Sequence, residues 1–282
     1  MSVMMSRIGK YQVVAPLHMT DYSDIFVCSD TVLDVRVCVK IYSPKNGADG
    51  AASSGAEELR GRFLHEAKVM ARMDHPHLVP IREYDHLEDG RPYIVMPFYP
   101  ATLKYEIGFD ATDPKRRRRL PPSRRPHAIA PGRAVRVLDQ VFGALSALHE
   151  FGLVHRDVKP GNLFLSAKKN GAIKLGDFGM VKVPGLADVE AGKWIGTPNY
   201  MSPEQANDSA GVDPRADIFA AGVLAFRMLV GRLPENGEPF PEGAVKGCPK
   251  GLGALVDQYR APNPDARPPD AATARKLLAA FH

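Results

Sequence analysis

The first hundred or so residues alternate between apolar and polar positions, as the strands of a half-buried sheet do. The clearest alternation runs over residues 35–42, where the valines and Ile41 share one face and Lys40 lies on the other. Five segments have strand character: residues 11–17, 25–28, 35–42, 78–84 and 93–98. The polar bend between the first two favours a hairpin. We therefore predict a small antiparallel sheet at the start of the chain.

After a loop rich in Gly, Ala and Ser, the spacing of apolar residues becomes helical. Ser54 followed by Glu57 is a capping-box signature, so a helix is expected to begin there. Its apolar face carries Glu66, and a carboxylate on such a face needs a partner. Arg62 or Lys68 on the same helix is the ordinary candidate for that partner.

Two further helices and a hairpin are predicted in the second half of the chain. Residues 133–150 repeat apolar side chains at helical spacing. Residues 218–230 are apolar all round, which predicts a buried helix. Between these helices, the apolar runs 163–165 and 172–175 flank an Asn-Gly pair, which is a strong hairpin signal.

Composition narrows the class of protein. The chain has 282 residues, of which 44% are hydrophobic, so it can bury a large core in one domain or two lobes. Its three cysteines are far apart, which argues against a disulfide framework or a zinc site and fits a reducing cytosol. The longest apolar run, residues 218–226, is too short to cross a bilayer. We therefore expect a soluble, cytoplasmic protein with no transmembrane segment.

A basic segment between Lys115 and Arg125 carries more positive charge than the formal net charge of +5 on the whole chain. Its prolines and the repulsion between like charges predict a mobile insert, at about 110–131, rather than a packed element. It could bind acidic protein, nucleic acid or anionic lipid, or it could be a solvated loop with no dedicated partner. Nucleic acid is the least favoured, because no aromatic residues interleave with the cations.

The residues with the most telling chemistry lie in two short motifs, at 154–162 and 177–179. Asp157 can accept a proton, and Lys159 follows two residues later, where its ammonium can meet a transferring phosphoryl group. Asn162 and Asp177 offer the oxygen ligands that Mg²⁺ prefers. A proton acceptor, metal ligands and positive charge are what transfer of a γ-phosphoryl group requires. The two motifs together predict a phosphoryl-transfer site.

These residues resemble the H-R-D-x-K-x-x-N catalytic loop and the D-F-G motif of protein kinases. The resemblance extends from about Tyr11 to Phe281. It implies the α+β bilobal protein-kinase fold, as one kinase domain overall. Residues 1–98 would form an antiparallel-sheet N-lobe with one long helix, and residues 99–282 a mainly helical C-lobe.

The same resemblance implies roles for residues outside the two motifs. Lys40 is similar to the phosphate-binding lysine of the V-A-I-K strand, and Glu66 to the glutamate that pairs with it. Residues 196–204 resemble the end of an activation segment, with Thr197 among the catalytic positions. The residues implied to bind the nucleotide are Leu17, Ile25, Cys38, Lys40, Pro97, Tyr99 and Phe164.

Two more positions resemble residues that support the site in this family. Asp217 is similar to the aspartate that holds the catalytic-loop backbone, although an ordinary acid at a helix N-terminus is the alternative. Arg267 resembles the arginine that pairs with the glutamate of the activation segment, here Glu204.

The activity that the resemblance implies is transfer of the γ-phosphoryl group of ATP, with Mg²⁺, to serine or threonine hydroxyls of a protein substrate. Lys159 and Thr197 are similar to the serine/threonine-specific branch, and residues 200–205 resemble bacterial members. The alternative is a pseudokinase or scaffold that binds nucleotide without turnover. A third possibility is a nucleic-acid-binding module. Retention of the charged and metal-binding positions favours the active enzyme.

The loop that would cover the nucleotide departs from the family's pattern. When Ile25 is aligned with the valine of G-x-G-x-x-G-x-V, the glycine positions are occupied by His18, Thr20 and Ser23. Side chains there restrict φ and hold the backbone back from the phosphates. We therefore expect weak binding of ATP, with phosphoryl transfer retained. The hydroxyls of Thr20 or Ser23 would replace part of the backbone N–H donors to the phosphates.

Regulation is also expected to differ from that of many relatives. Lys193 stands where they carry a phosphorylated threonine, and Arg156 resembles the arginine that would bind such a phosphate. Asp188 or Glu190 could pair with Arg156 instead. The hypothesis is activity without phosphorylation of this loop, or switching by a partner.

Overall fold

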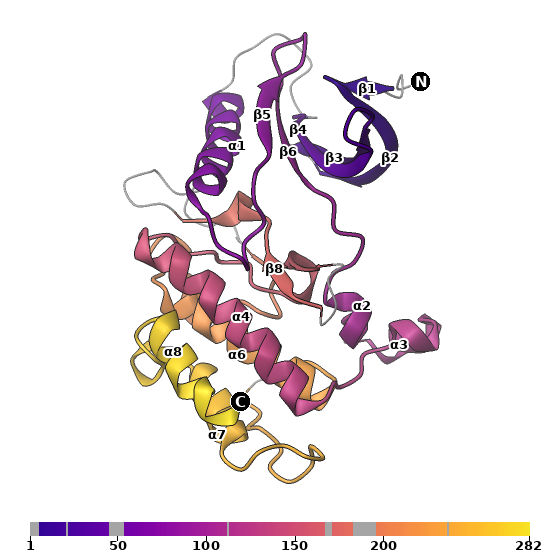
Figure 1. The fold of residues 1–282 in the computed structure, drawn as a ribbon. Helices are drawn as coiled ribbons and strands as arrows, with labels where there is room; N and C mark the ends of the chain where they lie inside the picture. The colour runs from indigo at the N-terminus through magenta and orange to yellow at the C-terminus, as the bar shows by residue number, and fades with distance from the viewer. Residues whose placement is uncertain are drawn as a thin grey trace. The chain divides into compact units, whose positions relative to one another are not determined.

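The computed structural model describes residues 6–20, 22–44, 54–111, 113–166, 171–182, 196–235 and 237–282. The chain divides into two compact units (Figure 1). The first unit comprises Met1–Asp74 and Val79–Tyr99, and the second comprises His75–Leu78 and Pro100–His282. Most strands lie in the first unit, whereas the second is mainly helical. The predicted α+β class is therefore confirmed.

The first unit contains a six-stranded antiparallel sheet with the strand order β1-β2-β3-β4-β6-β5. The strands are β1 (Arg7–Ile8), β2 (Tyr11–Met19), β3 (Ser23–Asp30), β4 (Val35–Tyr42), β5 (Glu83–His86) and β6 (Pro92–Pro97). The long helix of this unit is α1 (Ser54–Arg72). Residues 45–53, where the sequence predicts a flexible loop, lie outside the described residues.

Strand β4 presents different side chains to the two faces of the sheet, because successive residues of a strand point in opposite directions. One face carries a buried cluster that includes Val37, Val39, Ile41, Tyr93 and Val95. On the other face, Tyr42 packs against Phe63 of α1, with the ring centroids 6.0 Å apart. Lys40 shares this second face, so the strand directs its side chain toward α1.

The strand predicted at 78–84 is wrong in its position. Strand β5 begins only at Glu83, and Leu78 instead forms an isolated parallel bridge with Leu175 of the second unit. Pro80 lies between them and has no N–H to donate to a ladder. The apolar run therefore begins in the second unit, and its later residues belong to the first unit, where the strand forms only from Glu83.

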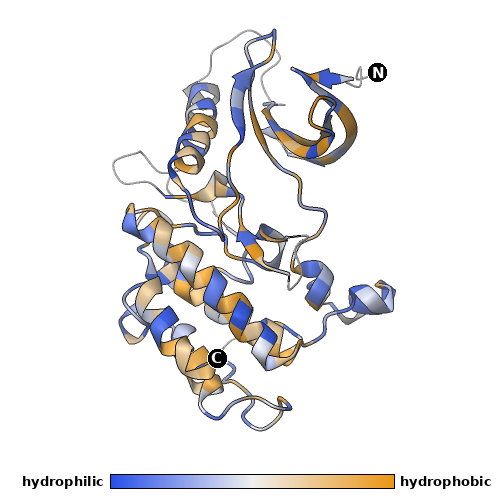
Figure 2. Cartoon of the chain, viewed as in Figure 1, coloured by the Kyte–Doolittle hydropathy of each residue, from blue (hydrophilic) through white to orange (hydrophobic). Residues whose placement is uncertain are grey.

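The second unit is built around two central helices, α4 and α6, and α4 contacts α6, α8 and β8. Its helices are α2 (Lys104–Ile107), α3 (Pro114–Arg119), α4 (Pro131–Glu150), α5 (Pro203–Asn207), α6 (Arg215–Val230), α7 (Leu252–Tyr259) and α8 (Ala271–Leu278). Helix α6 is buried almost throughout, and its apolar character is evident in Figure 2. Among the described residues, no helix is long and apolar enough to cross a membrane.

The basic insert is more ordered than the sequence predicts. Asp113 caps α3, since its side chain accepts a hydrogen bond from the N–H of Lys115 at 2.8 Å. The guanidinium of Arg125 donates to the carbonyls of Leu120 and Arg118 at 3.0 and 3.3 Å. Helix capping and these backbone bonds offset the repulsion between like charges, so the expected mobile segment folds as a short helix and turn.

The core of the second unit provides a direct test of its packing. Phe142 of α4 is fully buried, and its ring lies 5.1 Å from that of Tyr259 in an edge-to-face contact. We expect Phe142→Ala to lower the free energy of unfolding by about 3–5 kcal/mol, because it removes a buried ring and leaves a cavity. Chemical denaturation followed by circular dichroism measures the change.

The matched control is Phe151→Ala at the end of the same helix, where the side chain is exposed. This variant should change the free energy of unfolding by less than about 0.5 kcal/mol. Equal losses in the two variants would contradict the assignment of Phe142 to the core.

Candidate functional site

Lys40 and Glu66 form a buried ion pair in the first unit. Lys40 Nζ donates to both carboxylate oxygens of Glu66 at 2.8 Å. The side chains are 12% and 5% exposed, so water screens the pair weakly. Strand β4 supplies Lys40, and α1 supplies Glu66. Lys40 lies on the face opposite the valines, and Glu66 lies on the apolar face of its helix, as the residue patterns predict. The partner of Glu66 on this helix's apolar face is thus Lys40.

The turn between β2 and β3 is closed by its own hydroxyl group. Thr20 Oγ1 accepts hydrogen bonds from the backbone N–H groups of Ser23 and Tyr22 at 2.9 and 3.2 Å. Thr20 Oγ1 also lies 3.0 Å from the carbonyl oxygen of Ser23, and Ser23 is buried. The expectation that the hydroxyls of Thr20 or Ser23 replace backbone donors to a phosphate stays a prediction. The Thr20 hydroxyl occupies the N–H groups of the turn.

The side chains predicted to bind the nucleotide are distributed over both units. In the first unit, Ile25 lies opposite Lys40 across the β3–β4 pair, and Cys38 follows on the same face. Burial raises the pKa of the Cys38 thiol to about 12, so the thiol is neutral near pH 7. Leu17 lies at an irregularity of the β2–β3 register, and its side chain is exposed.

The remaining predicted nucleotide residues lie near the ends of strands. Pro97 is the last residue of β6, opposite Val37, and Tyr99 is partly buried just beyond it. In the second unit, Phe164 of β7 (Leu163–Leu165) forms an isolated bridge with Thr102.

Four polar side chains of the second unit form one hydrogen-bonded cluster. Thr197 Oγ1 donates to Asp157 Oδ1 at 2.8 Å, and Lys159 Nζ donates to the same hydroxyl at 2.8 Å. Lys159 Nζ lies 2.6 Å from Asp157 Oδ2, to which Asn162 Nδ2 donates at 2.8 Å. Asp157 and Asn162 are buried. The Asp157 carboxylate is thus fixed by a hydroxyl, an ammonium and an amide.

Asp217 holds the backbone of the loop at 154–162 from the start of α6. Its two carboxylate oxygens accept the N–H groups of His155 and Arg156, each at 2.8 Å, and His149 Nε2 lies 2.9 Å from Oδ2. Burial alone raises the pKa of Asp217, but the bonds from His149 and His155 outweigh it and the pKa is lowered overall. The alternative of an ordinary N-terminal helix acid is thereby excluded, because this carboxylate is fully buried.

Asn162 and Asp177 lie at the same end of a strand pair, because Asn162 precedes Leu163 and Asp177 follows shortly after its partner Leu175. Strands β7 and β8 (Ile173–Leu175) pair antiparallel, and the N–H of Gly176 donates to the carbonyl of Asn162 at 3.0 Å. Asp177 has φ 65°, and its side chain is exposed. Asn170 of the predicted Asn-Gly turn lies outside the described residues, whereas Gly171 is described, with φ 54°.

The donor set at this end of the pair suits a hard cation. Asn162 Nδ2 donates to both the carbonyl and the carboxylate of Asp157, at 2.9 and 2.8 Å, which leaves the amide oxygen on the opposite side. That oxygen and the carboxylate of Asp177 are the ligand types that Mg²⁺ prefers. The residues present therefore fit the metal that the motifs imply.

Arg156 has the left-handed backbone conformation, with φ 64°. Its guanidinium donates to the carbonyls of Met180 and Ser209 at 2.7 and 3.2 Å. The backbone carbonyl of Arg156 accepts a hydrogen bond from Gln205 Nε2 at 2.8 Å. A Cβ at Gly196 would lie 2.8 Å from that carbonyl, so this position requires glycine. The buried guanidinium is thus held by backbone carbonyls.

The acids proposed as alternative partners of Arg156, Asp188 and Glu190, lie outside the described residues, as does Lys193. The idea that this loop needs no phosphate therefore stays a prediction. The described contacts of Arg156 are consistent with it, because two carbonyl bonds already hold its guanidinium in place.

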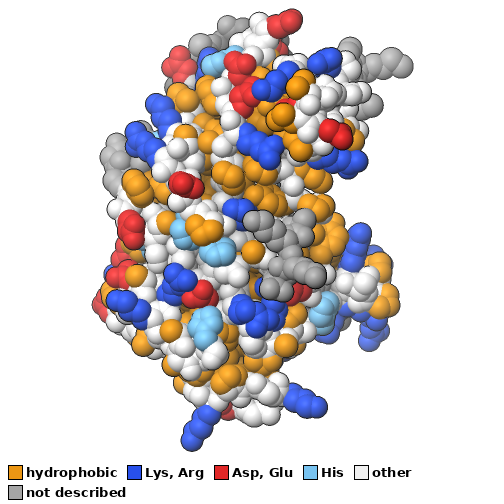
Figure 3. Space-filling view, in the orientation of Figure 1, with side chains coloured by type: hydrophobic (Ala, Val, Ile, Leu, Met, Phe, Trp, Pro, Cys, Tyr) orange, Lys and Arg blue, Asp and Glu red, His pale blue; other side chains and the backbone are white. Residues whose placement is uncertain are grey.

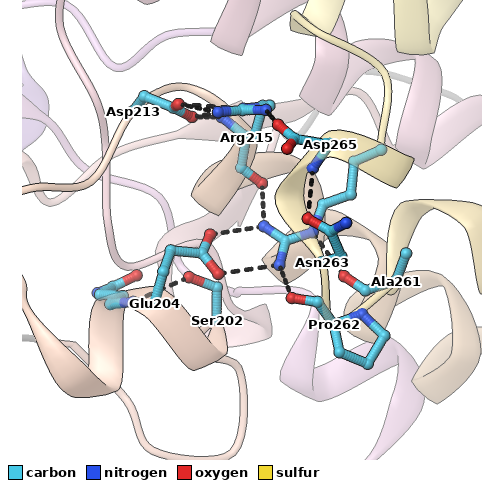
Figure 4. A network of polar contacts seen from close by, with 10 residues as sticks. Ser202, Glu204, Asp213, Arg215, Ala261, Pro262, Asn263 and Asp265 are labelled. Atoms are coloured by element: carbon cyan, nitrogen blue, oxygen red, sulfur yellow. Dashed lines mark hydrogen bonds and ion pairs between the residues drawn. The ribbon is translucent and has the colours of Figure 1, made fainter.

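Arg267 anchors the segment that follows Thr197. Its guanidinium forms a bidentate pair with Glu204, at 2.6 and 2.9 Å, and donates to the carbonyls of Arg215 and Pro262 (Figure 4). Burial raises the pKa of Glu204, but the hydrogen bond and charge of Arg267, with a backbone bond and one from Ser202, together outweigh burial, so the pKa is lowered overall. The pairing inferred from the resemblance is present.

One network was not foreseen from the sequence. Arg227, which only marked the end of an apolar run, is fully buried and donates to Asp110 Oδ1 at 2.7 Å. Tyr200 donates its hydroxyl to the other oxygen of Asp110 at 2.8 Å. Roughly ninety or more residues separate Asp110 from each partner, so no local pattern could indicate the contact. An arginine inside a buried helix was the available signal.

Comparison with known proteins identifies the class. The protein kinase domain family matches residues 21–247. The chain is 33% identical over 279 residues to serine/threonine-protein kinase PknL of Mycobacterium tuberculosis, which covers 93% of this chain and 63% of that protein. It is 34% identical over 237 residues to serine/threonine-protein kinase Pkn1 of Myxococcus xanthus, covering 82% and 30% respectively. The kinase domain of Mycobacterium tuberculosis PknI matches 99% of both chains, with a TM-score of 0.65 and 25% identity.

The chain therefore belongs to the protein kinase family. The relatives named above are bacterial serine/threonine kinases, and the similar solved structure is a kinase domain, so the family and fold expected from the motifs are confirmed. The chain spans 63% of the length of PknL. Protein kinases as a family take ATP as substrate, use Mg²⁺ and act on proteins.

The buried Asp217 predicts a pH-dependent contribution to stability. Asp217→Asn should lower the free energy of unfolding by about 1–3 kcal/mol near pH 7, because one of the two loop N–H groups loses its acceptor. The folded-state pKa of Asp217 is lowered, so its contribution is complete above the unfolded pKa of about 4 and is lost as the pH falls further. The difference between wild type and variant should therefore shrink in acid, as measured by urea denaturation at several pH values.

Asp265→Asn is the control, since that carboxylate is 81% exposed. It should change stability little at any of these pH values. A difference between wild type and Asp217→Asn that stayed constant below pH 4 would contradict the buried-carboxylate account.

Proposed function

We propose that this chain is an active serine/threonine protein kinase that transfers the γ-phosphoryl group of ATP to serine or threonine hydroxyls of a protein. The cluster of Asp157, Lys159, Asn162 and Thr197 is the observation that carries the proposal. It places a carboxylate, an ammonium and a hydroxyl within hydrogen-bond distance of one another, in a chain of this family. The Thr197 hydroxyl already donates a hydrogen bond to the Asp157 carboxylate, which would accept the proton of the substrate hydroxyl.

The residues divide the reaction between them. Asp157 accepts the proton of the substrate hydroxyl while the oxygen of that hydroxyl attacks the γ-phosphorus of ATP. The bond between the γ-phosphorus and the bridging oxygen breaks, and ADP leaves. Lys159 places positive charge near the transferring phosphoryl group. Thr197 positions both Lys159 and Asp157 through hydrogen bonds to its hydroxyl. Mg²⁺, held by Asn162 and Asp177, would neutralise charge on the phosphate oxygens when bound.

On the nucleotide side, Lys40 pairs with the phosphates and Glu66 orients it. Ile25, Cys38, Leu17, Pro97, Tyr99 and Phe164 are proposed to surround the adenine. The proposal includes a boundary near residue 98 between an N-lobe and a C-lobe. It also includes a cytoplasmic location, which the free thiols of Cys28, Cys38 and Cys248 support.

Asp157→Asn tests the assignment of the base. The variant should lower kcat by about 10²- to 10⁴-fold, because it removes the proton acceptor while an amide oxygen can still accept from Thr197. Nucleotide affinity should stay within about twofold of wild type. Phosphate transfer from labelled Mg-ATP to a generic protein substrate measures turnover, and calorimetry measures affinity.

Asp139→Asn is the matched control, because it removes the same charge from a surface pair with Arg275. Its turnover should equal that of the wild type. Near-normal turnover in Asp157→Asn would show that another group accepts the proton.

The closed turn at Thr20 predicts weak ATP binding that glycine should improve. Replacing Thr20 and Ser23 together by glycine frees the N–H groups that the Thr20 hydroxyl now occupies. We expect the KM for ATP to fall by about three- to tenfold, with kcat changed less than about twofold. Steady-state kinetics at varied ATP concentration gives both values.

Thr20→Ser keeps the hydroxyl and should leave the KM unchanged. An unchanged KM in the double glycine variant would contradict the role of the turn. Wild-type protein that bound Mg-ATP tightly yet never transferred phosphate, with or without the glycines, would favour the pseudokinase.

A further inference from the structure

The basic insert carries cations that the rest of the second unit does not use. Lys115, Arg117, Arg118 and Arg119 are exposed, and within the described part of the chain none of them has an ion-pair partner. Elsewhere in this unit, arginines pair with carboxylates, as in Arg133 with Glu106, Arg215 with Asp213, Arg227 with Asp110, Arg267 with Glu204 and Arg275 with Asp139. Figure 3 shows basic side chains gathered where Figure 1 places α3.

The insert presents these cations on a folded support. We call residues 113–125 the basic arm. Asp113 caps its helix, and Arg125 ties the end of the arm back to the carbonyls of Leu120 and Arg118. The guanidinium of Arg124 lies 5.6 Å from the ring centre of Phe109 at the base. Less conformational entropy is therefore lost when the arm binds than if it were a flexible tail.

A buried arginine anchors the two chain segments at the base of the arm. Arg227 donates to the carbonyls of Ile107 and His127, at 2.9 and 3.2 Å, in addition to its pair with Asp110. The N–H of His127 donates to the carbonyl of Ile107 at 3.0 Å. This bond joins the segment that leads into the arm to the segment that follows it. The arm is therefore attached to α6 at a fixed point.

The same anchor contacts the segment that follows Thr197. Tyr200, three residues after Thr197, donates its hydroxyl to Asp110 at 2.8 Å. The Tyr200 ring is buried, so this bond is shielded from water. Asp110 thus links the base of the arm to the segment whose threonine sits on the proposed catalytic carboxylate.

We propose that the basic arm is a docking site for an acidic segment of the protein substrate, and that it selects acidic proteins for phosphorylation. The inference rests on the proposed kinase function. Unpaired cations on a folded support attract carboxylates, and Asp110 connects the base of the arm to the segment that carries Thr197. Nucleic acid is the weaker fit, because no aromatic side chains interleave with the cations.

The test compares two synthetic peptides that share one neutral serine-containing sequence and differ by a run of glutamates. The arm variant replaces Lys115, Arg117, Arg118 and Arg119 by glutamine. At low salt, the KM of wild type for the acidic peptide should be about tenfold lower than for the neutral one, and the arm variant should lose this advantage. The kcat and the KM for the neutral peptide should not change.

A second variant removes the same number of positive charges elsewhere on the second unit. Its exposed replacements by glutamine are Arg136, Lys246, Lys250 and Lys276. It should keep most of the preference for the acidic peptide, because the effect depends on the arm and not on net charge. Equal loss in both variants would overturn the proposal.

Binding of the fluorescent acidic peptide, followed by anisotropy, gives a readout that needs no phosphoryl transfer. Arm-dependent binding without turnover of either peptide would support the docking site while refuting the kinase function. Turnover of the neutral peptide with no arm-dependent binding of the acidic one would refute the docking site alone. Arm-dependent binding of single-stranded DNA or of phosphatidylserine vesicles, with none of the acidic peptide, would also overturn the proposal.

Discussion

The buried carboxylate of Asp217 is the interaction on which the catalytic loop depends. It accepts the N–H groups of His155 and Arg156, and so holds Arg156 in a backbone conformation that non-glycine residues rarely adopt. Asp157 follows directly, so its position is set by the same two bonds. Because the carboxylate is buried, these bonds are strong, and leaving either N–H without an acceptor is costly.

Two buried guanidinium groups fix the segment between Thr197 and Glu204. Arg267 holds Glu204, and Arg227 holds Asp110, which in turn accepts the hydroxyl of Tyr200. Each guanidinium also donates to backbone carbonyls, so the desolvated donors are satisfied. Removing one partner of such a pair typically costs about 3–5 kcal/mol. The segment therefore has little conformational freedom, and the Thr197 hydroxyl stays hydrogen-bonded to the Asp157 carboxylate.

The first unit keeps the charged pair of the family's motif but uses its backbone donors differently. Lys40 and Glu66 retain a direct, weakly screened pair. The turn at Thr20, in contrast, satisfies its own N–H groups through the threonine hydroxyl. Electrostatic terms from lysine and metal outweigh neutral hydrogen bonds to phosphate. On these grounds, phosphoryl transfer is compatible with the loss of the glycines, and we expect nucleotide affinity to be the property that this loss lowers.

The sequence alone predicted most of the strands and the main helices, because these follow from short-range periodicity. Motifs such as 154–162 indicated the residues that we propose take part in the reaction. It also indicated the pair of Lys40 and Glu66 once the family resemblance was known. It misplaced the strand at 78–84, and it predicted a mobile insert where capping and backbone bonds build a helix.

Only the tertiary structure decided what lies beside Asp110. Its partners Tyr200 and Arg227 come from distant parts of the chain, and a contact across such a separation leaves no periodic signal in the sequence. The same holds for His149 beside Asp217. Burial removes these charged groups from water, and each must then find its partner in whichever segment the packing of α4 and α6 brings near.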